Sequence, residues 1–163
     1  MYQVGHYGAA LLVYAPLGTA VAVGGYEGLA LIGGFVTIAL STLPDFDQRV
    51  PMLEHRGPTH TVGFALLVGI LVAAAAAVLV GQSAPFVGLG LIAFAFAVGT
   101  LAIISHLFAD VITPMGVRPF WPLSGRHYTL DVTRAANPIA NYVLFGLGVG
   151  AVVCAVGIVT MVG

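Results

Sequence analysis

The chain alternates between long apolar segments and shorter polar connections. Five apolar segments approach or exceed the roughly 20 helical residues that cross a membrane, and they cover residues 6–23, 29–43, 59–80, 86–108 and 138–162. In lipid a segment must satisfy its own backbone hydrogen bonds, and the alternating pattern of a membrane β-barrel is absent from the sequence. The pattern therefore predicts an all-α, polytopic membrane helix bundle with about five transmembrane helices.

Polarity is concentrated in two of the connections. Residues 24–28 and 81–85 form short turns, whereas residues 44–58 and the proline-rich residues 109–137 are longer and polar. Five crossings place the first residues and both long connections on one membrane face. That face receives all five histidines, all five arginines and five of the six acidic residues, and Glu27 alone lies opposite. Because positive residues favour the cytoplasm, we expect a multi-pass cell-membrane protein with a cytoplasmic N-terminus and functional face.

Composition narrows the class of protein. Hydrophobic residues make up 60% of the chain and charged residues only 7%, against about a quarter in a typical soluble domain. We expect a single integral membrane domain over residues 1–163, surrounded by membrane lipids. The sequence makes no prediction about the number of subunits. No basic patch suggests binding to nucleic acid, so we expect no nucleic-acid partner. The first segment lacks the basic flank and cleavage pattern of a signal peptide, so we expect it to remain in the folded protein.

The connection after the second segment carries chemistry that is unusual for so apolar a chain. Residues 43–60 read LPDFDQRVPMLEHRGPTH. A turn after Pro44 can direct both Asp45 and Asp47 toward one ion, although an Asp-x-Asp pair alone is a weak signal. Ionisable groups near a membrane are costly and are usually functional, so the concentration of such groups here favours a site.

Histidines flank the end of the same connection. Proline is favoured in the first turn of a helix, so the third helix is predicted to begin near Pro58. That start places His60 in the first helical turn and His55 in the loop before it. Arg56, between them, has a simpler alternative as a loop contact to Glu54 or Asp47.

The fourth segment supplies a further pair. His106 and Asp110 are four residues apart and share one helical face, and His6 lies at the matching depth of the first segment. Imidazole and carboxylate ligands together suit Zn²⁺, Mn²⁺ or Fe²⁺, and we expect Zn²⁺ or Mn²⁺. Four histidines and three aspartates exceed the four ligands of one tetrahedral zinc. Either two ions share them, or some act as acid, base or supporting groups.

Three motifs together resemble a known family. The stretches LPDFD…HRGPTH, SHLFADVITPMGV and FWPLSGR are similar to those of the bacterial and archaeal membrane-bound metal-dependent hydrolases of the LexA-regulated inner-membrane type. The resemblance runs from His6 to Arg126, with Thr61 where the family commonly has serine, and His127 matches none of its motifs. It implies a polar metal-binding core formed by His6, Asp45, Asp47, His55, His60, His106 and Asp110.

These observations favour a metal-dependent hydrolase acting at the membrane surface, with a phosphoester or lipid-like small molecule as substrate. Asp45 or Asp47 is the expected general base. Arg56, near the positive end of the third helix, is expected to hold an anionic group with help from Arg126. These four residues form the expected catalytic set.

Two other functions stay open at this stage. An ion or metal transporter would place ionisable residues near the membrane midplane, yet residues 62–80 and 138–163 contain no charged side chain. A noncatalytic membrane protein would use the metal only to tie its loops together. A closed ligand set would favour that function, and an open coordination position would favour the enzyme.

Overall fold

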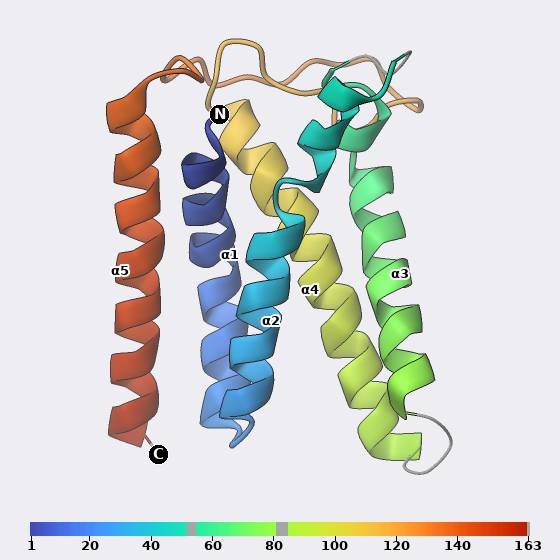
Figure 1. Cartoon of the computed structure of the whole chain (residues 1–163), viewed down its shortest axis with the longest axis vertical. Coiled ribbons are helices and arrows are strands. Elements are labelled where there is room, and N and C mark those ends of the chain that lie inside the picture. The colour runs from blue at the N-terminus through green and yellow to red at the C-terminus, as the bar shows by residue number, and fades with distance from the viewer. Residues whose placement is uncertain (52–54, 81–84, 163) are drawn as a thin grey trace.

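The computed structural model describes residues 1–51, 55–80 and 85–162. Within them the chain forms five α-helices, namely α1 (Gln3–Val23), α2 (Glu27–Leu40), α3 (Val62–Val80), α4 (Pro85–Val111) and α5 (Pro138–Val162), as Figure 1 shows. Five helical segments are long and apolar enough to cross a membrane. The predicted all-α membrane bundle with five spans is confirmed. The expected turn at residues 81–85 lies mostly outside the described residues.

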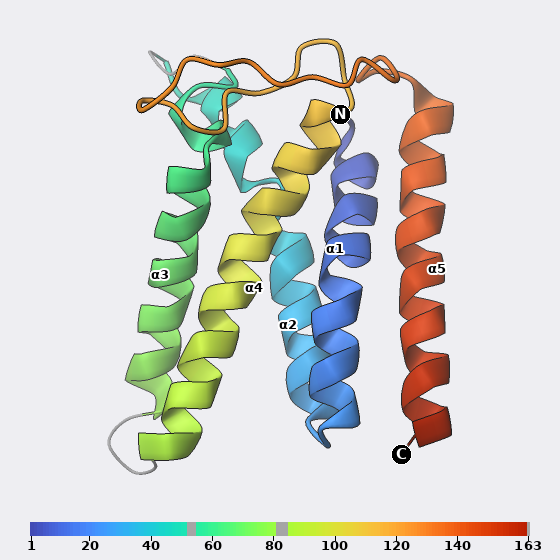
Figure 2. The same cartoon turned by 180° about the vertical axis from the view of Figure 1, so that it is seen from behind.

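The helices stand roughly side by side. α1 packs between α5 and α2, α4 crosses the middle of the bundle, and α3 packs along α4. The N-terminus and the two polar connections lie at one end, and the C-terminus lies at the other (Figures 1 and 2). The expected segregation of polarity therefore holds, because the segments that carry the histidines and arginines share one end, which we call the polar end.

The last connection forms an ordered layer over the polar end. Val117 and Tyr128 exchange two backbone hydrogen bonds of 3.0 and 2.9 Å. The layer is tied to the helices beneath it, because Val62 N donates to Pro119 O at 2.8 Å and Leu130 N donates to Val111 O at 2.7 Å. These hydrogen bonds hold the layer against the helix ends.

The short second helix explains how polar residues enter the bundle. α2 has 14 residues, which extend about 21 Å and fall short of a hydrocarbon core of about 30 Å. A 3₁₀ helix, η1 (Leu43–Arg49), continues the segment and starts with a proline at its second position. The span is completed only by η1, as the range Glu27–Arg49 indicates. Asp45 and Asp47 consequently lie among the helix ends rather than on an outer loop.

The start of the third helix differs from the prediction. Pro58 opens a separate 3₁₀ turn, η2 (Pro58–His60), and α3 begins only at Val62. Thr61 between them is extended, and its hydroxyl accepts a hydrogen bond from Phe64 N at 3.1 Å. Thr61 is therefore the N-cap of α3. Because an N-cap residue has an extended backbone, the helix cannot continue back through Thr61, and His60 lies outside it.

Glycines let two helix pairs approach closely. A Cβ atom at Gly148 in α5 would collide with the backbone of Gly8 in α1, and one at Gly69 in α3 would collide with the backbone of Phe96 in α4. The backbones of α1 and α5 therefore meet at Gly8 and Gly148. Glycine likewise lets α3 and α4 pack closely, because small residues allow the backbones of membrane helices to approach each other.

Replacing Gly148 by leucine is expected to destabilise the bundle by about 1–3 kcal/mol or more, because the new side chain must push α5 away from α1. The melting temperature of the detergent-purified protein measures the effect. Gly150→Leu is the matched control, since a Cβ at Gly150 meets nothing within 4 Å. Equal melting temperatures for the two variants would contradict the close α1–α5 packing.

Candidate metal centre

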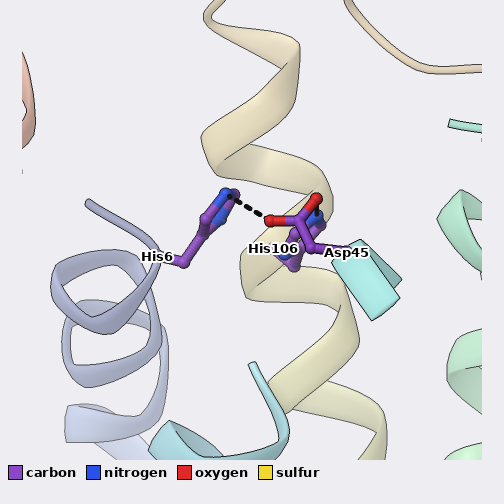
Figure 3. A group of neighbouring side chains, drawn as sticks. All are labelled: His6, Asp45 and His106. Atoms are coloured by element: carbon purple, nitrogen blue, oxygen red, sulfur yellow. Dashed lines mark ion pairs between the residues drawn. The ribbon is translucent and has the colours of Figure 1, made fainter. Parts of the chain in front are cut away.

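Four elements deliver histidine and aspartate side chains to one buried place at the polar end. His6 comes from α1, Asp45 from η1, His60 from η2, and His106 and Asp110 from α4. The side chains of the three histidines and Asp110 are at most 1% exposed, whereas that of Asp45 is 22% exposed. Figure 3 shows His6, Asp45 and His106 converging from three separate elements. We call these five residues the cluster.

Hydrogen bonds fix which ring nitrogen of His106 carries its proton. Nδ1 of His106 lies 2.8 Å from the backbone carbonyl of Ser41. A carbonyl can only accept, so Nδ1 donates, and Nε2 of the neutral ring keeps its lone pair. A histidine oriented in this way by a backbone carbonyl is typical of a metal ligand.

His60 is oriented in the same sense. Its Nδ1 lies 3.0 Å from Thr59 Oγ1 and 3.3 Å from Asp47 Oδ2. The Thr59 hydroxyl already donates to Asp47, so it can only accept from His60, and Nδ1 of His60 is the donor. Burial lowers the pKa of His60 below the usual value for histidine, which favours the neutral form that binds metals.

The two free nitrogens face each other. Nε2 of His60 and Nε2 of His106 are 3.0 Å apart. Two lone pairs at this distance repel, so the arrangement calls for a proton or a cation between the rings. Two nitrogens that bind one zinc ion at about 2.0–2.1 Å stand about 3.3 Å apart in tetrahedral geometry, close to the observed separation.

Carboxylates complete the surroundings of these nitrogens. Asp110 Oδ2 lies 3.5 Å from Nε2 of both His60 and His106, and Asp45 Oδ1 lies 3.8 Å from both. These separations exceed ordinary hydrogen bonds of about 2.7–3.2 Å. Asp110 Oδ2 is buried and has no hydrogen-bond partner among the described residues. The spacing fits ligands around an ion better than direct hydrogen bonds.

His6 extends the cluster toward α1. Its ring stacks on that of His106 with centroids 3.9 Å apart, and its Nε2 lies 3.6 Å from Asp45 Oδ2. Both of its ring nitrogens are buried without a hydrogen-bond partner in the described part of the chain. Unsatisfied buried nitrogens are costly, and a bound ion would satisfy at least one of them.

The ligand atoms fall into three overlapping groups, each able to hold one metal ion within the described residues. They are His6–Asp45–His106, Asp45–His55–His60, and His60–His106–Asp110. Asp45, His60 and His106 each belong to two groups, so the positions adjoin one another. The donor chemistry fits a divalent cation, and the geometry accommodates one or two ions.

Asp47 has a different position from the other predicted ligands. Its carboxylate accepts hydrogen bonds from Arg56 N at 3.1 Å and Thr59 Oγ1 at 3.0 Å, and lies 2.9 Å from Nδ1 of His55. Together with the contact to His60, four groups surround it. Asp47 therefore lies behind His60 and orients it. His55 is 37% exposed at the side chain and forms the outer edge of the site.

Arg56 lies beside the cluster and stabilises it through hydrogen bonds. It adopts a left-handed backbone with φ of 63°, and its guanidinium donates to Asp110 Oδ1 at 2.9 Å, to Thr113 Oγ1 at 3.1 Å and to Gly116 O at 2.9 Å. The backbone N–H of Arg56, rather than its side chain, donates to Asp47, and Glu54 lies outside the described residues. Most of its donors are thus committed to the protein, unlike the anion-binding role expected from sequence.

Arg126 is not brought to the cluster. It is exposed, and its guanidinium lies over the ring of Tyr128, 5.3 Å from the centroid. Three supporting residues were not predicted from the sequence, namely Ser41, Thr59 and Thr113. Two of them lie near recognised ligands, one residue before His60 and three after Asp110, so a search for adjacent hydroxyls would have found them. The Ser41 contact uses a backbone carbonyl and leaves no signal in the sequence.

Fold and site together define a class, a multi-pass helical membrane protein with a buried histidine–aspartate cluster that could hold a metal at one end. A family model described as the YdjM inner membrane protein matches residues 1–162, so the chain belongs to that family. The description names a location and no reaction. No curated protein and no solved structure matches the chain.

Proposed function

We propose that the protein is a membrane-bound metal-dependent hydrolase whose site is the cluster at the polar end. The observation that carries the proposal is the pair of lone-pair nitrogens of His60 and His106, 3.0 Å apart and flanked by the carboxylates of Asp45 and Asp110. Zn²⁺ and Mn²⁺ both suit this donor set. One or two ions fit the overlapping groups.

The roles of the residues follow from their contacts. His60, His106 and Asp110 would hold the ion, and Asp45 and His6 would complete its surroundings or hold a second one. A divalent cation supplies Lewis acidity that lets water lose a proton near neutral pH. Asp47 and Ser41 fix the tautomers of His60 and His106.

Asp45 is the better candidate for the general base. Asp47 is buried and already accepts from several donors, so protonating it would break them. Asp45 is partly exposed, and its side-chain hydrogen bond within the described residues comes from Gln48 Nε2 at 3.2 Å. Its opening to solvent also favours an enzyme over a structural metal site, because a catalytic centre must admit water and substrate. The substrate would be a phosphoester or lipid-like molecule at the membrane surface.

Removing the metal is expected to abolish hydrolysis. The purified protein is treated with a chelator and then assayed with para-nitrophenyl phosphate in detergent and with phosphatidic acid in vesicles. Activity should be lost, and adding Zn²⁺ or Mn²⁺ should restore it. Metal bound at stoichiometric amounts without turnover of either probe would instead indicate a noncatalytic metal site.

We propose that the polar end faces the cytoplasm. All five arginines belong to segments at that end, in accord with the preference of positive residues for the cytoplasmic side. A reporter that is active only outside the cytoplasm should be active when fused after Gly163, and one that is active only in the cytoplasm should be silent. The reverse result would place the cluster on the outer face.

A further inference from the structure

A cavity of about 240 Å³ adjoins the cluster at the polar end. Its polar walls are His55 and Arg56 from one connection and Arg118 and His127 from the other, with Trp121 beside them. We propose that this cavity binds the phosphate group of a phosphate monoester, with Arg118 as its main anion ligand. This assignment rests on the proposed function and gives that function its substrate class.

The charge of the walls favours an anion. Two guanidinium groups and two imidazoles line the cavity, and none of its described lining residues is acidic. The Arg56 guanidinium is paired with Asp110 at 2.9 Å, so the positive charge available to a ligand is that of Arg118. Arginine matches the geometry of phosphate oxygens and can bind them through two parallel hydrogen bonds. The volume lies below the roughly 300–1,000 Å³ of sites for drug-sized ligands. The cavity therefore suits a small anionic group rather than a whole lipid or a peptide.

The cavity and the cluster share a wall. His55 and Arg56 line the cavity, and they also contact Asp47 and Asp110 of the metal centre at 2.9 Å each. None of the five cluster residues lines the cavity, so a phosphate held there would be separated from the cluster by this wall. Arg56 Nε is buried and has no hydrogen-bond partner among the described residues, so one donor of this wall is still to be satisfied.

Arg118 differs from Arg56 in how freely its side chain can serve a ligand. Arg118 is exposed, and it forms no ion pair with any residue in the described ranges. Its backbone is held in place because Trp121 N donates to Arg118 O at 3.2 Å. His127, another lining residue, is held by a 2.6 Å hydrogen bond from Nε2 to Met115 O. The walls are thus positioned by backbone contacts, while the Arg118 guanidinium remains available.

The phosphate could come from a soluble ester or from a lipid headgroup. Exposed apolar side chains stand in the same connection, with Phe120 48%, Trp121 47% and Leu123 95% exposed. Aromatic residues of this kind commonly lie at the level of the lipid headgroups. The shared chemistry is the phosphate monoester, and the experiment separates the two sources.

Trp121 is the one tryptophan in the chain, so its fluorescence reports on the cavity. Metal-loaded protein is titrated in detergent with inorganic phosphate and glycerol 3-phosphate at constant ionic strength, and retention of radiolabelled phosphate is measured by equilibrium dialysis. In a second arm, the protein is placed in nanodiscs with phosphatidic acid or with phosphatidylcholine alone. We expect saturable binding, which Arg118→Ala should weaken about tenfold or more, as for other hydrogen bonds to charged groups.

Arg134→Ala is the matched control, because Arg134 is an exposed arginine of the same connection that does not line the cavity. A response to soluble phosphates, or to phosphatidic acid alone, supports the site and identifies the source. No saturable binding in either arm, or equal binding by wild type and Arg118→Ala, overturns it. Metal content is measured in the same samples. Phosphate binding by protein that holds no metal would contradict the proposed hydrolase but support the anion site. Bound metal without phosphate binding would contradict the anion site but leave the proposed hydrolase standing.

Discussion

Replacing His106 by alanine is expected to remove the bound metal and all hydrolysis while leaving the bundle inserted in the membrane. The change deletes the Nε2 lone pair that faces His60 at 3.0 Å and that lies 3.5 Å from Asp110 Oδ2. Loss of a residue that only supports a metal ligand costs 10–100-fold in affinity, so loss of a ligand should cost about 100-fold or more. Elemental analysis and a zinc titration of the purified variant measure the change.

His127→Ala is the control for this variant. It removes an imidazole from the same end of the molecule, but His127 is exposed and its side-chain nitrogen contacts Met115 O rather than the cluster. It should keep its metal. If His106→Ala retains wild-type metal content and affinity, the cluster is not the metal site, and the histidine–aspartate contacts are ion pairs that satisfy one another.

Replacing Asp47 by asparagine is expected to weaken metal binding about 10–100-fold without eliminating it. The carboxylate accepts from Arg56 N and Thr59 Oγ1 and lies 3.3 Å from Nδ1 of His60. An asparagine amide would turn an NH₂ group toward one of these donors, so His60 would lose part of its orientation. The melting temperature should also fall, because buried donors are left without an acceptor.

The size of that loss separates two roles for Asp47. A loss as large as that of His106→Ala would make Asp47 a metal ligand itself, as the family resemblance implies. No loss would show that His60 needs no support from Asp47. Asp131→Asn is the control, because Asp131 is an exposed aspartate of the polar end whose left-handed backbone, with φ of 49°, asparagine tolerates well.

Much of the architecture could be predicted from the sequence because the solvent is lipid. Apolar segments in a membrane must be helical, so the apolar segments predict the five spans, although the second is short and is completed only by η1. Counting the crossings assigns the polar residues to one end. The spacing of His106 and Asp110 on one helical face is likewise a local property. Each of these inferences depends on residues close together in the chain.

The contacts within the site could be identified only from the tertiary structure. Whether Asp45 or Asp47 faces the cluster depends on the depth at which α2 stops and on the 3₁₀ geometry of η1, which no hydrophobic pattern encodes. The choice of Arg118 over Arg126 as a cavity residue depends on how residues 111–137 fold across the helix ends.

The sequence by itself therefore determined the membrane helices, their number and the polar end, since these follow from local hydrophobicity and helical periodicity. Only the tertiary structure decided that His60 and His106, 46 positions apart, present their lone pairs to each other and that Arg56 braces Asp110. Such contacts arise from the packing of α1, η1, η2 and α4 against one another. They are fixed by hydrogen bonds between side chains and the backbone, such as the one that His106 Nδ1 donates to the Ser41 carbonyl, an acceptor that any residue type can supply.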